Sequence, residues 1–180
     1  MGYPATDIFD IKFIERTKKN LEDFKGENNF TNLINNLIGL IFIPHEYNNK
    51  RKRQNISFLK KSISEIEEFA NIFSSDQVEI IVDGELVALP KFKYIKDNKA
   101  LSIEEVKTED LLRLMRNSFA HANLTPFGEG NIWQGVIIKN YQDKKKERKD
   151  KYNFIAVLKR KELEKFAITI ADLYLDDAQK

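Results

Sequence analysis

Hydrophobic residues recur at intervals of three and four along most of this chain, the spacing that places them on one side of an α-helix. The segment after Asn29 is a clear example, because Phe30, Leu33, Leu37 and Ile41 share one face while asparagines occupy the other. Capping residues, glycines and prolines mark the ends of these patterns. They predict helices over residues 6–26, 29–43, 58–73, 102–122 (or 108–122) and 161–176.

The period changes from helical to alternating in two parts of the chain. Residues 78–89 are rich in β-formers around Asp83-Gly84, a dipeptide that favours a tight hairpin turn. Residues 132–141 and 152–159 look like two further strands on either side of a charged stretch. No repeat, low-complexity linker or change of composition divides residues 1–180. The sequence therefore predicts one domain that is mainly α, a helical bundle with two short β-hairpin additions.

The fourth predicted helix carries the candidate chemistry on its polar face. When its residues are placed around the helix axis, the apolar side chains from Leu111 onward gather in one stripe. Arg113, Asn117 and His121 fall outside that stripe as an i, i+4, i+8 series, and Arg116 lies on the other flank of the same polar face. His121 is thus predicted to lie away from the buried stripe rather than to serve as a core residue.

The place of His121 in the last turn gives it two opposing influences. The negative end of the helix dipole favours the imidazolium form, whereas neighbouring arginines oppose protonation. A histidine in such surroundings is a candidate general acid or base near neutral pH. Two basic segments, one containing Lys50, Arg51 and Arg53 and the other spanning 144–151, could guide an RNA backbone. Runs of this kind are also common as plain solvated loops.

Composition narrows the choice of function. The net charge of +2, from 30 basic and 28 acidic residues, argues against a permanent coat for nucleic acid but leaves room for a local basic patch. Cysteine is absent and only two histidines are present, so we expect no disulfide, no thiolate site and no metal site. Without a visible signal peptide or membrane span, we expect a cytoplasmic protein without a membrane partner.

The segment 111–124, LLRLMRNSFAHANL, resembles the signature helix of the HEPN superfamily, and 31–44, TNLINNLIGLIFIP, resembles the helix that accompanies it. The resemblance covers roughly residues 28–175, although the hairpin at 78–89 has no counterpart in the pattern. It implies an Arg-Asn-x3-His motif made of Arg116, Asn117 and His121. It also implies a homodimer in which two signature helices face each other and form a composite site.

What the resemblance implies for activity is a metal-independent endoribonuclease without a cofactor. The RNA 2′-hydroxyl would attack the adjacent phosphate, His121 would move a proton, Arg116 would stabilise the phosphoryl oxygens, and Asn117 would orient His121 or the phosphate. Arg113 is added from its place in the helical series, as a contact for phosphate or across the dimer.

Such an enzyme would be a toxin or antiphage-defence effector, restrained by an antitoxin or regulatory protein. The alternatives are a non-catalytic HEPN module for dimerisation or for RNA or nucleotide binding in a defence or regulatory complex, and a plain helical interaction domain.

Overall fold

The computed structural model describes residues 9–23, 29–50, 56–130, 132–141 and 152–178. Its elements are α1 (Phe9–Asp23), α2 (Asn29–Lys50), the short 3-10 helices η2 (Ser57–Lys60) and η3 (Ile63–Glu65), α3 (Glu67–Phe73), β1 (Gln77–Val82), β2 (Glu85–Pro90), β3 (Phe92–Lys96), β4 (Lys99–Leu101), α4 (Thr108–Ala120), β5 (Leu124–Glu129), β6 (Ile132–Tyr141), β7 (Tyr152–Lys159) and α5 (Arg160–Ala178). Among the described residues, no helix is long and apolar enough to cross a membrane.

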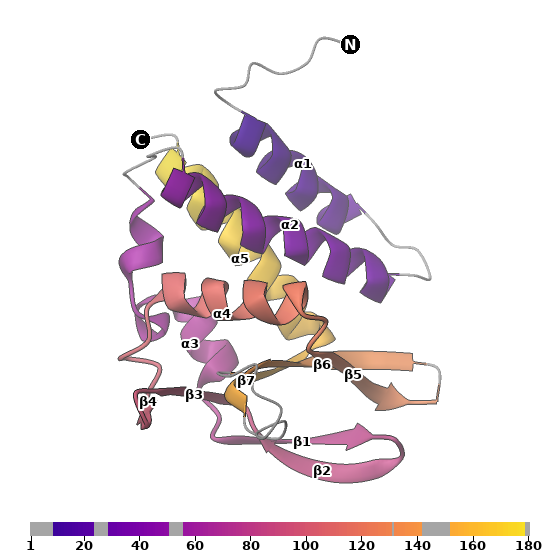
Figure 1. Ribbon diagram of the computed structural model, residues 1–180. Helices are drawn as coiled ribbons and strands as arrows, with labels where there is room; N and C mark the ends of the chain where they lie inside the picture. Colours follow the sequence, from indigo (N-terminus) through magenta and orange to yellow (C-terminus); the bar gives the residue numbers. More distant parts are fainter. Residues whose placement is uncertain (1–8, 24–28, 51–55, 131, 142–151, 179–180) are drawn as a thin grey trace.

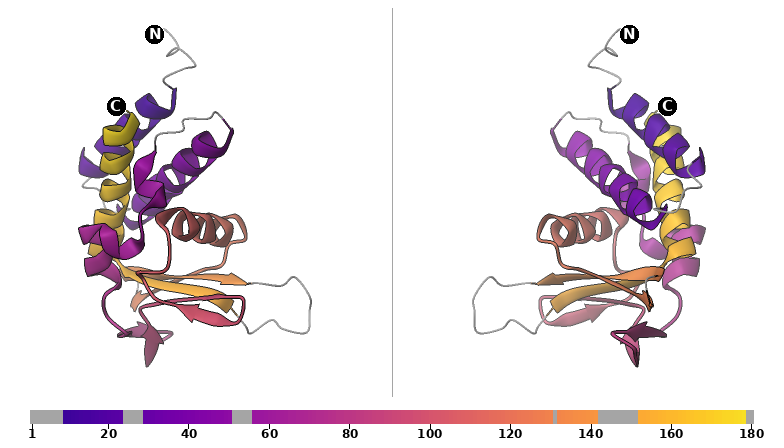
Figure 2. Two further views of the ribbon diagram at one scale, coloured as in Figure 1. Left: turned by 90° about the vertical axis from the view of Figure 1, so that its left-hand side faces the viewer. Right: turned by 90° about the vertical axis from the view of Figure 1, so that its right-hand side faces the viewer.

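A five-stranded antiparallel sheet, in the order β4-β3-β7-β6-β5, forms the middle layer of the molecule (Figure 1). The helix α4 crosses one face of this sheet, with α2 and α1 stacked beyond it, and the β1–β2 hairpin covers the other face (Figure 2). Successive side chains of β6 face opposite sides of the sheet and belong to two separate cores. Val136 and Ile138 belong to the core beneath the helices, whereas Ile137 belongs to a second core beneath the hairpin.

The predicted fold class, mainly α with two small hairpin additions, is wrong. The protein is mixed α/β, because the described residues form a five-stranded antiparallel sheet and a two-stranded sheet beside the helices. Because both faces of the sheet are covered, the central strands read as continuous apolar runs such as Phe154–Leu158, all of it buried. The hairpin predicted over 78–89 does form, with Asp83 and Gly84 at positive φ in its turn. Its role as the second cover of the sheet could not be read from the local pattern.

Three strands were absent from the prediction. The turn between β3 and β4 uses Asp97 and Asn98, both at positive φ, and lacks the glycine that usually marks such a turn. Strand β5 contains Pro126. From the sequence, this proline is predicted only to end the preceding helix. Proline is tolerated there because β5 is at the edge of the sheet formed by the described strands.

Two helices differ from their predicted extents. The helix α2 continues through Pro44 to Lys50 although proline removes one hydrogen bond of the helix, and Pro44 is buried. The single helix expected over 58–73 is broken into η2, η3 and α3. Its backbone is engaged elsewhere, since the N–H of Ile63 donates to Val106 and the N–H of Thr108 donates to Lys61, both over 2.9 Å.

Candidate functional site on helix α4

The helix α4 is held between α2 and the sheet by its apolar face. Leu111, Leu112, Leu114 and Met115 are almost completely buried. Ser118 continues this buried face, and its hydroxyl donates to the carbonyl of Leu114 over 2.8 Å. The polar side chains lie on the opposite face, as the helical period predicts, but Ala122, which the same pattern places in the buried stripe, is exposed.

The end of α4 fixes the place of His121, the residue that caps the helix. The N–H of Asn123 donates to Ser118 over 2.9 Å and the N–H of Ala122 donates to Phe119 over 3.1 Å, which together form a Schellman motif. Ala122 takes the left-handed conformation, with φ 52°, that this motif requires. The carbonyl of Asn123 then accepts from Lys139 of β6 over 3.0 Å, so the turn is tied to the sheet.

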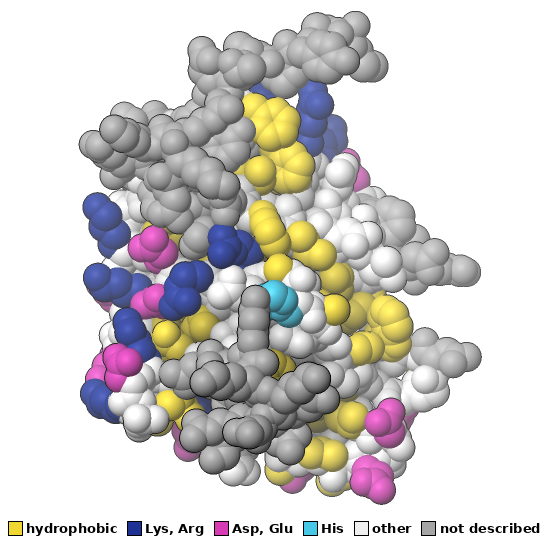
Figure 3. Space-filling view, viewed as in Figure 1, with side chains coloured by type: hydrophobic (Ala, Val, Ile, Leu, Met, Phe, Trp, Pro, Cys, Tyr) yellow, Lys and Arg dark blue, Asp and Glu magenta, His cyan; other side chains and the backbone are white. Residues whose placement is uncertain are grey.

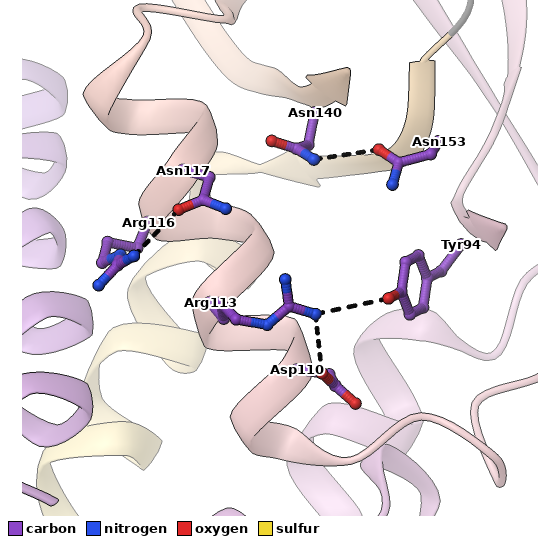
Figure 4. Close-up of polar contacts among 7 residues, drawn as sticks. All are labelled: Tyr94, Asp110, Arg113, Arg116, Asn117, Asn140 and Asn153. Atoms are coloured by element: carbon purple, nitrogen blue, oxygen red, sulfur yellow. Dashed lines mark hydrogen bonds and ion pairs between the residues drawn. The ribbon is translucent and has the colours of Figure 1, made fainter. Parts of the chain in front are cut away.

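Arg116 and Asn117 meet on the polar face, one turn before the cap. The guanidinium Nη2 of Arg116 donates to the amide Oδ1 of Asn117 over 3.2 Å (Figure 4). Both side chains are half-buried, whereas His121 is exposed. The N–H of His121 still donates to the carbonyl of Asn117 over 3.1 Å, so the helical series from Asn117 to His121 continues up to the cap.

Arg113 points to the other flank of α4, away from Arg116 (Figure 4). Its guanidinium forms an ion pair with Asp110 over 2.8 Å and donates to the hydroxyl of Tyr94 in β3 over 3.5 Å. Burial alone would lower the pKa of Arg113, but the hydrogen bonds to Asp110 and Tyr94 outweigh it and hold the pKa above its usual value. The two arginines of the predicted site therefore have different surroundings.

Histidine, basic and apolar side chains meet on the face of the molecule that carries α4. Figure 3 shows a histidine side chain near its centre, with lysine and arginine side chains interspersed with acidic ones on one side and a band of apolar side chains over α1 and α2 on the other. Guanidinium groups near an exposed imidazole suit an anionic ligand such as a phosphodiester. Among the described residues, no group of three or more histidine and carboxylate side chains could hold a metal ion.

The family model described as HEPN pEK499 p136 matches this chain over residues 1–180. The chain belongs to the HEPN family. HEPN domains are often ribonucleases, and they commonly bind RNA and form dimers. No curated protein and no solved structure matches the chain significantly.

In this HEPN domain, the predicted basic segment begins at Lys50, at the end of α2. Lys50 is the last residue of α2, but its side chain, together with Arg51 and Arg53, lies outside the described residues, as does 144–151. Their predicted contact with RNA stays a prediction. The catalytic assignment of Arg116, Asn117 and His121 and the RNA contact of Arg113 likewise remain predictions about activity.

The structure also brings residues to this HEPN site that the sequence did not predict. Asn140 of β6 donates from Nδ2 to Oδ1 of Asn153 in β7 over 3.0 Å, with Asn140 on the side of Asn117 and Asn153 farther from it (Figure 4). The sequence held one signal for Asn140. It follows Val136 and Ile138 at alternate positions of the strand, and both of those residues are apolar. Asp110 also gave a signal, because it lies three residues before Arg113 on the same helix. Tyr94 gave none, since its role depends on where β3 meets α4.

Proposed function

We propose that this HEPN domain is a metal-independent endoribonuclease, with Arg116, Asn117 and His121 as its active residues. The observation that supports the proposal is the Arg116–Asn117 hydrogen bond. It lies on the same helix face as His121, the exposed residue that caps α4. A guanidinium fork and imidazole groups can supply what RNA cleavage needs without a nucleophile from the protein, because the attacking nucleophile is the 2′-hydroxyl of the RNA itself.

The proposed reaction needs two proton transfers and one centre of charge stabilisation. The 2′-hydroxyl loses its proton to a base and its oxygen forms a bond to phosphorus. The bond from phosphorus to the 5′-oxygen breaks, and that oxygen receives a proton from an acid. The products carry a 2′,3′-cyclic phosphate and a 5′-hydroxyl. Arg116 would stabilise the charge on the phosphoryl oxygens, and Asn117 would position Arg116 through the 3.2 Å hydrogen bond.

A homodimer would provide the second proton-transfer group. Each copy has one His121, at the exposed end of α4. Two copies placed with their α4 helices facing each other would supply one imidazole as base and one as acid. The proposal therefore includes a dimer through α4, and the expected mass in light scattering is twice that of the 21.1 kDa chain. A monomer that cleaves RNA at full rate would contradict the composite site.

Cleavage of cellular RNA would be harmful if unrestrained, which favours a toxin or antiphage-defence effector in the cytoplasm, held inactive by an antitoxin or regulatory protein. The alternative within the same family is a non-catalytic HEPN module for dimerisation or for RNA or nucleotide binding. The two differ in one measurable property, namely whether RNA is cut.

The test compares wild type, His121→Ala and His45→Ala on total RNA in EDTA. His45→Ala replaces the other histidine of the chain and is the matched control. We expect cyclic phosphate ends with wild type and His45→Ala, and loss of cleavage with His121→Ala. Intact RNA with a dimeric wild type would favour the non-catalytic module. Loss of wild-type activity on adding EDTA would refute the metal-independent mechanism.

A further inference from the structure

The guanidinium groups of Arg113 and Arg116 lie on different flanks of α4 (Figure 4). The two residues are three positions apart, which separates them by about 4.5 Å along the helix axis. Because their side chains diverge from there, the two cations do not close on one phosphate. With Arg116 at the scissile phosphate, Arg113 is directed to a different group of the ligand.

Two contacts hold the guanidinium of Arg113 in a fixed position. Its Nη2 forms the 2.8 Å ion pair with Asp110 and donates to the hydroxyl of Tyr94 over 3.5 Å. Tyr94 is 4% exposed and lies opposite Phe154 of β7, so its ring is fixed within the sheet. A long side chain restrained by its own helix and by a buried strand residue loses little rotamer freedom when a ligand binds. Arg113 is therefore preorganised.

Part of this guanidinium is left for a ligand. Among the described residues, the hydrogen bonds of Arg113 all start from Nη2, so Nη1 and Nε keep their own N–H groups. The side chain is 38% exposed, which allows a ligand to reach it. In Figure 4 its Nη1 points to the side of Asn117. Guanidinium N–H groups only donate, and phosphate oxygens are the acceptors that suit them best.

Asn117 lies between the two arginines and serves both flanks. Its Oδ1 accepts from Arg116 over 3.2 Å, while its Nδ2 points away from Arg116, to the flank that carries Arg113 (Figure 4). Among the described residues, this amide nitrogen has no hydrogen-bond acceptor. It adds a second donor on the Arg113 flank. The carboxylate of Asp110 lowers the net charge there, so the attraction for an anion should be weaker than at Arg116.

We propose that Arg113 and the amide nitrogen of Asn117 bind a second phosphate of the RNA, the neighbour of the phosphate at Arg116, and that Tyr94 positions Arg113 for it. The inference rests on the proposed function, which supplies the first phosphate. RNA has a phosphate at every nucleotide, so a strand across α4 presents the two groups in succession. Phosphate contacts fix the register of a strand. Two of them determine which bond of the strand faces His121.

The first experiment adds the second phosphate to a minimal substrate. The kcat/KM of the dinucleoside monophosphate that the wild type cleaves best is compared with that of the same molecule carrying an added 5′-phosphate or 3′-phosphate. We expect one added phosphate to raise kcat/KM about ten-fold, the effect of one hydrogen bond between charged groups. In Arg113→Met the gain should fall below about two-fold, and in Tyr94→Phe to about three-fold, because Asp110 alone then holds the guanidinium.

The second experiment measures binding without cleavage. His121→Ala protein is titrated into single-stranded RNA at several salt concentrations. Adding Arg113→Met should reduce the slope of log Kd against log salt by about 0.7, the value for one phosphate contact. Arg160→Met, at the exposed start of α5, is the matched control and should change neither the slope nor the gain. Thermal unfolding of each variant shows that folded proteins are compared.

An added phosphate without effect on the wild type, or a gain that Arg113→Met retains, would overturn the second phosphate site. A purely structural role of Tyr94 would slow all three substrates equally and leave the gain at its wild-type value, which would refute positioning. Where the wild type cleaves none of the short substrates, the salt slope alone decides, and an unchanged slope in Arg113→Met refutes the site. Cleavage of total RNA shows separately whether the nuclease itself fails.

Discussion

The guanidinium of Arg116 donates to the amide oxygen of Asn117, the next residue of α4, over 3.2 Å. This bond restrains a long side chain that would otherwise lose considerable rotamer freedom on binding an anion. An arginine held in place before its ligand arrives is preorganised, and preorganised charge is what stabilises a transition state effectively. The Arg116–Asn117 pair is therefore the feature on which the activity should depend most directly.

We expect Arg116→Lys to reduce RNA cleavage by about a hundred-fold or more, the effect of losing one charge-stabilising donor. Lysine keeps the charge but loses the planar fork that contacts two phosphoryl oxygens. Single-turnover cleavage of a labelled RNA measures the effect. Arg160→Lys, an exposed arginine at the start of α5, is the control and should cleave as wild type does. Comparable rates for the two variants would remove Arg116 from the active site.

Asn117→Ala should reduce kcat more than it raises KM, because Asn117 positions Arg116 for a charge that develops in the transition state. We expect a loss of about ten-fold in kcat, smaller than for Arg116→Lys because the guanidinium itself remains. Steady-state kinetics with the same RNA separates the two constants. A change confined to KM would indicate that Asn117 contributes to RNA binding alone.

Ala122→Gly should stabilise the protein by about 1 kcal/mol, because Ala122 has φ 52° in the turn after α4 and glycine adopts this conformation without strain. Ala120→Gly is the matched control, and it should destabilise the protein. Ala120 is the exposed last residue of the same helix and has a helical backbone, so glycine there should cost up to about 1 kcal/mol. Urea unfolding gives both free energies. A destabilising Ala122→Gly would contradict the strained cap.

Glu162→Gln should destabilise the fold, because Glu162 is the ion-pair partner of Lys91, whose side chain is only 3% exposed. Removing one member of such a pair leaves a charge without compensation, and we expect a loss of about 2 kcal/mol since Glu162 itself is partly exposed. Lys91→Met, which removes the buried charge itself, should cost less. Urea unfolding at neutral pH compares the two variants.

The same pair predicts a pH dependence. Burial lowers the pKa of Lys91 below the ordinary value of 10.5, against the opposing effect of Glu162. The unfolded chain therefore binds more protons between the folded pKa and 10.5, and stability rises with pH across that window. Glu162→Gln removes the opposing effect, so part of its lost stability should return as the pH approaches 10.5. Lys91→Met should show no such recovery.

Ile80→Ala tests the covering role of the β1–β2 hairpin. Ile80 is 4% exposed and packs with Phe127 and Ile137 in the core on the second face of the sheet. Its truncation should cost about 3 kcal/mol, the usual effect in a packed core. Ile81, its neighbour on β1, faces the other way and lies outside this core, so Ile81→Ala should cost clearly less. Equal losses would mean that the hairpin does not cover the sheet through this face.

Most of the helical structure could be predicted from the sequence, because an amphipathic pattern depends on the sequence alone. The helices α1 and α5 lie within a few residues of their predicted bounds, and so do β6 and β7. Of the two predicted starts of α4, the one at Thr108 is confirmed and the one at Ser102 is wrong. The segment 56–73 could not be predicted in the same way. Its apolar spacing fits a helix, but Ile63 hydrogen-bonds to Val106 instead, a contact that depends on a residue far along the chain.

By itself, the sequence determined that α4 has a polar face with Arg116, Asn117 and His121 on it, because helical geometry places residues by their spacing. Only the tertiary structure decided what surrounds that face. It brings Tyr94 of β3 to the guanidinium of Arg113, and it places Asn140, hydrogen-bonded to Asn153, on the side of Asn117. Strand order and register set these neighbours, and both depend on pairing between distant segments that a local pattern does not encode.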